Sequence, residues 1–151
     1  MSDVFSKAKR SEVMSHIRAR DTGPELAVRS VLHRMGYRFR LHRTDLPGKP
    51  DIVLSRFGTV IFVHGCFWHR HKGCRFAYTP KSRQKFWLGK FQSNVTRDHR
   101  VNRELAKLGW YVVTVWECEL RFPDRLSKRL EVTLNRRLQT LAPSTSRGSN
   151  R

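Results

Sequence analysis

Three short apolar segments of strand-forming residues restrict the folds open to this chain more than any other feature. Residues 51–54 (DIVL) and 59–63 (TVIFV) flank a turn at 56–58 and together predict a β-hairpin. Residues 110–116 (WYVVTVW) form a nearly continuous apolar run, which is typical of a strand at the centre of a sheet that is covered on both faces. Before them, residues 37–41 alternate between apolar and basic side chains and predict a half-buried strand.

Helical periodicity surrounds these strands. A first helix is predicted after Thr22-Gly-Pro-Glu25, a candidate capping box, and ends at Gly36. A long helix is predicted over about residues 82–108, with Phe91, Val95, Asp98, Val101, Leu105 and Leu108 at helical spacing. A last helix carries Leu126, Leu130, Leu134, Leu138 and Leu141. Helices that alternate with strands in this way predict an α/β layer fold.

The chain of 151 residues is long enough for one domain with a hydrophobic core. We predict a basic N-terminal arm over residues 1–21, a folded domain over 22–141 and a disordered, Ser- and Pro-rich tail over 142–151. No apolar run reaches the length of a membrane span, and the first residues lack the apolar stretch of a signal peptide. These features predict a cytoplasmic protein without a membrane partner.

The formal net charge of +19 is far more than solubility requires, because such a charge destabilises a compact state through self-repulsion. It predicts a polyanionic partner, and nucleic acid is the commonest one. A ribosomal or membrane-surface protein would be equally basic, so charge alone does not separate these classes.

Residues 63–74 (VHGCFWHRHKGC) gather three histidines and two cysteines. The chain has three cysteines, Cys66, Cys74 and Cys118. An odd number in a cytosolic chain argues against a disulfide framework and favours metal binding, although three buried free cysteines remain the alternative. Three thiolates and one histidine would complete a tetrahedral Cys₃His zinc site. The spacing does not choose between His69 and His71 as the fourth ligand.

The dipeptide Pro50-Asp51 heads the first strand of the hairpin, and this arrangement resembles the core of PD-(D/E)xK nucleases. In such a core a carboxylate at a strand tip holds a divalent metal, and the next strand supplies further ligands and the group that activates water. Here residues 62–65 (FVHG) replace the usual acidic-x-Lys pattern. An enzyme of this kind would need a backbone carbonyl as metal ligand and a histidine as base. A turn aspartate without chemistry is the alternative for Asp51.

Five segments in order closely resemble the very short patch repair (Vsr) DNA mismatch endonucleases. They are the helix start with Glu25, LPGKPD at 46–51, VIFVHGCFWH at 60–69, Phe86-Trp87 with Asn94, and VWEC at 115–118. The resemblance covers about residues 5–135. It implies a PD-(D/E)xK-like fold with a central mixed sheet, flanking helices and a structural zinc site.

The resemblance also implies a function. It predicts a bacterial, Mg²⁺-dependent endonuclease that nicks double-stranded DNA beside the T of T:G mismatches produced by deamination of 5-methylcytosine. The expected protein is a monomer associated with the nucleoid. Mismatch-repair proteins and a cognate cytosine-5 methyltransferase are expected as further partners.

Site residues follow from the same resemblance. The zinc ligands would be Cys66, His71, Cys74 and Cys118. The Mg²⁺ ligands would be Asp51 and the carbonyl of Val63. The catalytic groups would be Asp51, His69 as general base, His64 at the scissile phosphate and Glu25 near the metal. The rings that intercalate into DNA would be Phe67, Trp68 and Trp87, with Met14 entering from the opposite groove.

Several of these residues have ordinary alternatives. Glu25 could serve only as a capping residue, His64 could be a polar loop histidine, and Trp87 could be a core residue of the long helix. A nuclease of the same fold with another DNA specificity is one rival function. A zinc-stabilised DNA-binding protein without catalysis is the other, and Asp51 argues against it because a carboxylate would repel a bound phosphate.

Overall fold

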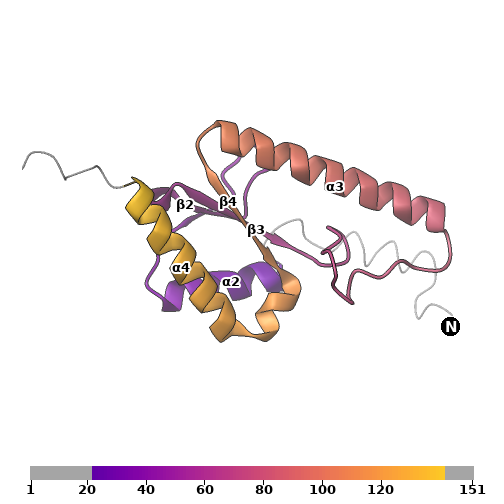
Figure 1. Cartoon of the computed structure of the whole chain (residues 1–151), viewed down its shortest axis with the longest axis horizontal. Coiled ribbons are helices and arrows are strands. Elements are labelled where there is room, and N and C mark those ends of the chain that lie inside the picture. The colour runs from indigo at the N-terminus through magenta and orange to yellow at the C-terminus, as the bar shows by residue number, and fades with distance from the viewer. Residues whose placement is uncertain (1–21, 142–151) are drawn as a thin grey trace, which may run out of the picture.

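The structure, a computed structural model, describes residues 22–141 (Figure 1). Its main elements are α2 (Gly23–Arg34), β1 (Arg40–Leu41), β2 (Ile52–Leu54), β3 (Thr59–His64), α3 (Gln84–Lys107), β4 (Tyr111–Trp116) and α4 (Pro123–Leu141). Short 3₁₀ helices cover Ser55–Phe57 and Glu117–Arg121. The predicted basic arm and tail lie outside the described residues.

The strands of the described chain form one mixed sheet in the order β1-β2-β3-β4. The first three strands pair antiparallel, and β3 pairs parallel with β4. Ile61 of β3 lies opposite Ile52 on one side and Val113 on the other. The predicted α/β fold with a central mixed sheet flanked by helices is confirmed.

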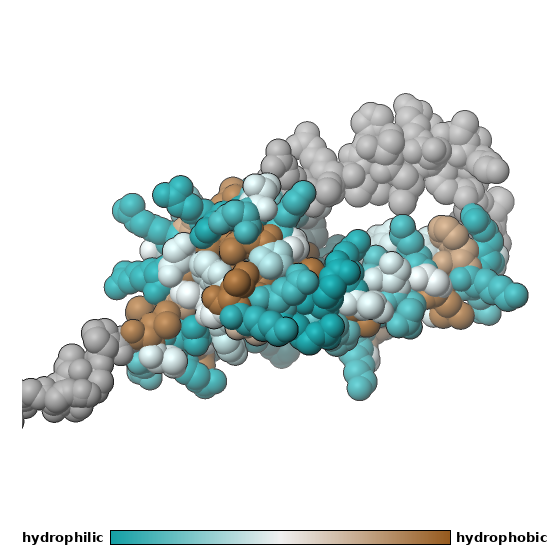
Figure 2. Space-filling model, turned by 90° about the horizontal axis from the view of Figure 1, so that it is seen from above, coloured by the Kyte–Doolittle hydropathy of each residue, from teal (hydrophilic) through white to brown (hydrophobic). Residues whose placement is uncertain are grey.

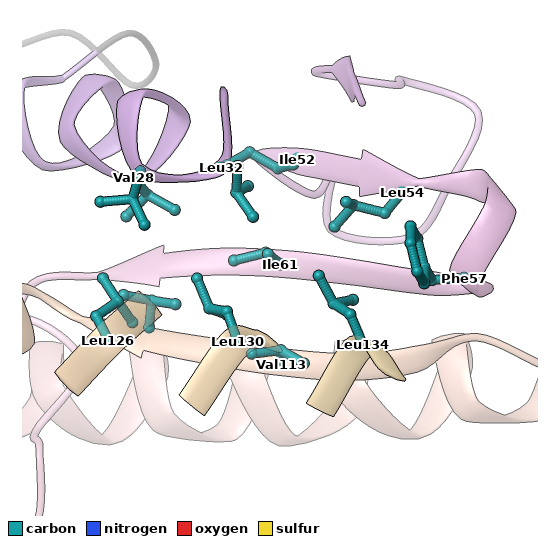
Figure 3. Close-up of a cluster of buried hydrophobic side chains, with 12 residues drawn as sticks. Val28, Leu32, Ile52, Leu54, Phe57, Ile61, Val113, Leu126, Leu130 and Leu134 are labelled. Carbon is teal, nitrogen blue, oxygen red and sulfur yellow. The ribbon is translucent and has the colours of Figure 1, made fainter. Parts of the chain in front are cut away.

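Helices cover both faces of this sheet, with α2 and α4 on one face and α3 on the other (Figure 1). On the α2 and α4 side, Leu126, Leu130 and Leu134 of α4 are at most 1% exposed and point at the sheet (Figure 3). They meet Ile61 and Val113 in the larger hydrophobic cluster. The leucine spacing of the last helix therefore reflects a buried stripe, as predicted.

The opposite face is covered by a smaller cluster. Val101 and Leu105 of α3 pack there with Val53, Val60 and Phe62 of the sheet. Successive strand residues thus alternate between the two clusters, because successive side chains on a strand point to opposite faces. The result is a sheet whose inner strands β2 and β3 are buried on both sides. The predicted central position of the run at 110–116 is wrong: β4 is an edge strand of the described sheet, and only its Val113 and Val115 are buried.

The long helix α3 has nearly the predicted bounds, but its buried face differs from the predicted one. Leu108 is 61% exposed and Val95 is only partly buried, whereas Asn94 is buried. Leu108 is the C-cap residue, just after the last helical residue Lys107. For Asn94 and Val95 the reason is that only the C-terminal part of α3 lies over the sheet (Figure 1). Its N-terminal part extends past the sheet and faces the loop after β3.

The predicted strand over residues 37–41 is mostly wrong. Only Arg40 and Leu41 pair, with Val53 and Ile52 of β2. Tyr37 and Phe39 pack against the larger cluster without joining the ladder. Since β2 is only three residues long, it offers few partners to the chain before Arg40.

The structure shows the Thr22 half of the predicted capping box at the start of α2. The side-chain oxygen of Thr22 accepts a hydrogen bond from the Glu25 N–H at 3.3 Å, and Pro24 lies in the first turn. This cap fixes the point where Glu25 enters the fold. In the described part of the chain, no helix combines the length and apolarity needed to cross a membrane.

Candidate active site and the cysteine-histidine cluster

A cavity of about 840 Å³ opens beside the carboxyl end of β3. It is lined from several elements by the start of α2, the approach to β2, the loop after β3 and the middle of α3. All the predicted catalytic and magnesium-binding residues line it, namely Glu25, Asp51, Val63, His64 and His69. The structure therefore brings together side chains that are up to 44 positions apart in sequence, from Glu25 to His69.

Asp51 lies directly before β2 and is tied to the neighbouring strand. Its Oδ2 accepts a hydrogen bond from the Val63 N–H at 2.7 Å. Burial raises the pKa of Asp51 to about 6, and the negative charge of Glu25 acts in the same direction, although the bond from Val63 opposes both. A buried carboxylate beside a second carboxylate is a site at which a cation is favoured.

Glu25 and His42 complete this corner of the cavity. One ligand atom from each of Glu25, His42 and Asp51 lies within 4.8 Å of the others. Glu25 is 3% exposed, and its Oε2 lies 3.4 Å from Nη2 of Arg29 and 3.7 Å from Nε2 of His42. The two carboxylates suit a hard divalent cation, whereas Nε2 of His42 lies 3.0 Å from Nη2 of Arg29. Sequence reasoning missed His42, because nothing in its local pattern connects it to residues from other elements.

His64 and His69 form a stacked pair on the other side of the cavity. Their ring centroids are 3.8 Å apart and their planes differ by 5°. His64 ends β3 and is 7% exposed. Burial lowers the pKa of His64 to about 4, with a smaller contribution from the charge of His69. A neutral His64 at pH 7 follows, and such a ring can both donate and accept a hydrogen bond.

Asp98 of α3 orients His69. Its Oδ2 lies 2.6 Å from Nδ1 of His69. Burial works against ionisation of Asp98, but the hydrogen bond and charge of His69 prevail, so the pKa of Asp98 lies below its usual value. With Nδ1–H directed at a carboxylate, Nε2 of His69 is left to accept a proton.

Sequence reasoning counted Asp98 among the positions of the buried helical face and assigned it no chemistry. A signal was present, because a carboxylate among otherwise apolar positions at that spacing needs a partner. The partner could not be identified, since His69 belongs to a loop whose path the sequence does not give.

The three cysteines and His71 meet at one point between the loop after β3 and the turn after β4. One ligand atom from each of Cys66, His71, Cys74 and Cys118 lies within 4.8 Å of the others. Sγ of Cys118 lies 3.4 Å from Nδ1 of His71. His69 faces Asp98 instead, so the geometry places His71 with the cysteines. Three sulfur donors and one nitrogen suit tetrahedral zinc.

The surroundings of the cluster hold it in place. The His71 ring stacks on Trp116 with a centroid distance of 4.2 Å, and the His71 N–H donates to the Cys66 carbonyl at 3.0 Å. Burial raises the pKa of the Cys66 thiol to about 12. Three thiols gathered around one imidazole, one of them desolvated in this way, fit a site that is completed by a metal cation.

The aromatic residues of the loop gather around Phe67. Its ring lies 5.1 Å from those of Trp68 and Phe91 and 5.5 Å from that of Trp87. Asn94 of α3 donates to the Trp68 carbonyl at 3.1 Å. Phe67, Trp68 and Trp87 are all partly exposed, and Trp87 lies outside both core clusters. Met14, predicted to act with them, lies outside the described residues.

A carboxylate at a strand tip, a buried histidine on the next strand and an imidazole-carboxylate pair thus face one cavity. Next to them is a donor set for a structural metal. This combination is typical of metal-assisted hydrolases.

Comparison with known proteins narrows this class. Residues 2–75 match the family model of the DNA mismatch endonuclease Vsr. The chain is 50% identical to the type II nicking enzyme V.XorIIP of Xanthomonas oryzae pv. oryzae over 89% of this chain and 98% of the relative. It is 47% identical to the type II nicking enzyme V.NmeAIP of Neisseria meningitidis, over 80% and 86%. It is 46% identical to the DNA mismatch endonuclease Vsr of Escherichia coli, over 84% and 81%.

The chain belongs to the Vsr family of DNA mismatch endonucleases, as its motifs predicted. It is accordingly a nuclease that acts on DNA. The rival interpretation of a DNA-binding protein without catalysis loses its basis.

Proposed function

We propose that this protein nicks double-stranded DNA beside the T of T:G mismatches that arise from deamination of 5-methylcytosine, and so initiates very short patch repair. The observation that carries the proposal is the convergence of Asp51, His64 and the His69–Asp98 pair on one cavity that is also lined by the partly exposed Trp68. On this proposal the core is of the PD-(D/E)xK type. A cognate cytosine-5 methyltransferase would produce the 5-methylcytosine whose deamination later gives the mismatched T. Mismatch-repair proteins would then be further partners, and the enzyme would work as a monomer in the bacterial nucleoid.

The carboxylates of Glu25 and Asp51 suit a Mg²⁺ ion. Asp51 and the carbonyl of Val63 would be its protein ligands. The Val63 N–H donates to Asp51, and the N–H and C=O of one residue in an extended strand point to the same side, so the carbonyl would lie on the Asp51 side. When bound, Mg²⁺ would stabilise the negative charge that develops on the phosphate during hydrolysis. Glu25 would lower the local potential further and favour the cation.

The histidines would then divide the remaining work. His69 would take a proton from water through Nε2, because its Nδ1 is held by Asp98 at 2.6 Å. His64, kept neutral by burial, would donate a hydrogen bond to the scissile phosphate. The stacked arrangement keeps both rings at a fixed separation, which suits a phosphate placed against both.

Cys66, His71, Cys74 and Cys118 would hold a structural Zn²⁺. Four protein ligands leave no open position for a substrate, so the ion would contribute rigidity and no chemistry. It would anchor the loop that carries His69 and the aromatic residues to the turn after β4.

The partly exposed rings of Phe67, Trp68 and Trp87 would enter the base stack at the mismatch, with Met14 opposite. Opening a step costs a few kcal/mol and costs less at a mismatch, so such a wedge favours mismatched DNA. The surface of the described chain is largely hydrophilic on the α3 side (Figure 2), and the chain carries a net charge of +19. Most of the affinity would therefore come from phosphate contacts and would weaken with salt.

The proposal is tested with end-labelled duplexes that carry each single mismatch in several sequence contexts, incubated with the protein and Mg²⁺. We expect a nick in the T-containing strand of T:G duplexes and little cleavage of matched DNA. Omitting Mg²⁺ should stop the reaction. Efficient cleavage of other mismatches or of branched DNA, with T:G left intact, would favour the rival nuclease specificity.

A further inference from the structure

Arg70 makes an unusual number of contacts for a side chain of a surface loop. Its Nη1 donates to the carbonyls of Phe67 at 3.1 Å and Tyr78 at 3.0 Å. Its Nη2 donates to the carbonyl of Ala77 at 2.7 Å and to Oγ1 of Thr79 at 3.2 Å. One guanidinium thus connects Phe67, at the beginning of the loop after β3, to residues 77–79, which follow Cys74 of the cysteine-histidine cluster.

The same guanidinium also fixes the loop to α3. Cζ of Arg70 lies 3.8 Å from the centroid of the Phe91 ring, within range of a cation–π contact. The Arg70 backbone is in the left-handed region with φ of 55°, which is costly for a residue with a Cβ. Such a conformation persists where the surrounding contacts impose it, and here those contacts are the ones made by its own side chain.

Tyr78 is the outermost ring that this arrangement places. It is 62% exposed, yet its ring centroid lies 5.1 Å from that of Phe67. Phe67 also contacts Trp68 and Trp87, so the four rings form one continuous group, which we call the aromatic wall. Because Arg70 holds the Tyr78 carbonyl, the backbone under the exposed ring is fixed before any ligand arrives.

The chemistry of the Arg70 contacts is specific to arginine. A guanidinium offers five donors in a planar fork and can stack on a ring at the same time. Lysine has a single flexible ammonium and cannot bridge these acceptors while lying flat on Phe91. The arrangement is therefore sensitive even to a substitution that keeps the charge.

We infer that Arg70 is a positioning residue that preorganises the aromatic wall, and that Tyr78 is a further DNA-stacking residue at its outer end. The inference rests on the proposed function, since it takes the wall to be the surface that meets an opened mismatch. A ring held in place loses little conformational freedom when a base stacks on it, so a fixed wall binds an unstacked base more tightly than a mobile one. Arg70 thereby acts on mismatch preference through the rings and not through its own charge.

The test compares Arg70→Lys, Arg70→Ala and Tyr78→Ala with the wild-type chain. Arg75→Ala is the matched control for charge: Arg75 lies in the same loop over the Phe76 ring at 4.8 Å, and its side chain is exposed. Tyr111→Ala is the control for an exposed tyrosine, because Tyr111 begins β4 opposite Thr59, at the other end of β3 from His64. Dissociation constants are measured for T:G and T:A duplexes of one sequence. A 2-aminopurine beside the mismatch reports unstacking through its fluorescence, and zinc content and thermal unfolding are recorded for each variant.

We expect Arg70→Lys and Tyr78→Ala to weaken T:G binding by about 5–100-fold, the range of one lost base–aromatic contact, with a much smaller change for T:A. The 2-aminopurine signal of the T:G complex should fall in the same variants. Arg75→Ala should weaken both duplexes alike, and Tyr111→Ala should change neither. Arg70→Ala is interpreted only if its zinc content equals that of the wild-type chain. If its zinc content is lower, the binding data of Arg70→Lys and Tyr78→Ala test the inference.

The outcomes distinguish a failure of the proposed function from a failure of the role assigned to Arg70 and Tyr78. A wild-type chain without preference for T:G over T:A refutes the proposed function and this inference with it. The inference alone is refuted if the wild-type chain prefers T:G over T:A and the Arg70→Lys and Tyr78→Ala variants keep both this preference and the 2-aminopurine signal.

Discussion

Replacing Asp98 by asparagine is the sharpest test of how the candidate base works. The substitution keeps the shape of the side chain and removes its charge. An amide can direct its NH₂ group at Nδ1 of His69 and favour the tautomer whose Nε2 already carries a proton, which cannot act as a base. In the other orientation the amide oxygen still accepts from Nδ1–H but no longer stabilises the imidazolium that forms when His69 takes a proton.

The size of the effect follows from the contact between the two side chains. The distance of 2.6 Å between Asp98 Oδ2 and His69 Nδ1 is that of a short, charge-assisted hydrogen bond. Such bonds contribute about 1.5–3 kcal/mol, which corresponds to roughly 10–150-fold in rate. A part of the His69 side chains would also hold the tautomer that cannot act as a base, and this lowers the rate further. The expected loss in rate then approaches the range of about 10²–10⁴-fold for a lost general base.

The assay is single-turnover nicking of a T:G duplex at saturating enzyme, run beside binding measurements. The rate of the chemical step should fall in Asp98→Asn, whereas the dissociation constant should change little. Asp124→Asn is the matched control, because Asp124 is an exposed carboxylate at the start of α4, outside the cavity. Unchanged nicking by Asp98→Asn, or an equal loss in Asp124→Asn, would refute the idea that Asp98 activates His69.

Four further predictions concern other parts of the molecule. Asp51→Ala should abolish nicking and leave DNA binding unchanged or tighter, because a negative charge near the phosphate is removed; paired nicking and gel-shift assays check this, and residual nicking near the wild-type rate would contradict it. Cys118→Ser should lower both zinc content and thermal stability, as measured by metal analysis and calorimetry, and an unaltered zinc content would contradict it. Trp68→Ala should weaken binding to mismatched DNA far more than to matched DNA, and equal losses in a fluorescence titration would count against the wedge. Gly48→Ala should lower the free energy of unfolding by about 2–4 kcal/mol, as measured by denaturant unfolding. The reason is that Gly48 has φ of 73° and a Cβ there would lie 2.3 Å from Val101 Cγ1. A loss below about 0.5 kcal/mol would contradict this and show that the loop relaxes.

Much of the fold could be predicted because the apolar pattern was unambiguous. The hairpin, the existence of β4 and the leucine stripe of α4 depend on local periodicity, which a sequence displays directly. The edge position of β4 depends on strand order, which an apolar run does not give. The face of α3 could not be predicted in the same way. Its buried residues are set partly by a loop that packs beside it, and Asn94 is buried there because it donates to the Trp68 carbonyl.

The candidate site shows the same division. Asp51, His64 and the cysteines carry sequence signals in their motifs, and the structure gathers them as expected. His42 and Asp98 come from elements distant in sequence, and their importance appears only when tertiary packing brings them to Glu25 and His69. Spacing also left the histidine of the cysteine cluster open between two candidates. Tertiary structure distinguishes them, because His71 lies with the cysteines and His69 faces Asp98.

The position of the candidate base depends on contacts that lie outside the hydrophobic cores. His69 belongs to the loop between β3 and α3, which is held from three directions: by the cysteine cluster toward β4, by Asn94 and Asp98 of α3, and by Arg70 within the loop. Both cores, in contrast, are built from apolar residues of the sheet and helices and include only Val63 of the proposed site residues, at their edge. Losing one of these attachments should therefore affect chemistry and mismatch preference before it affects the global fold. The cysteine cluster is the attachment with the widest reach, because it connects the loop to a different strand, and its metal would be needed to place His69 even though it takes no part in hydrolysis.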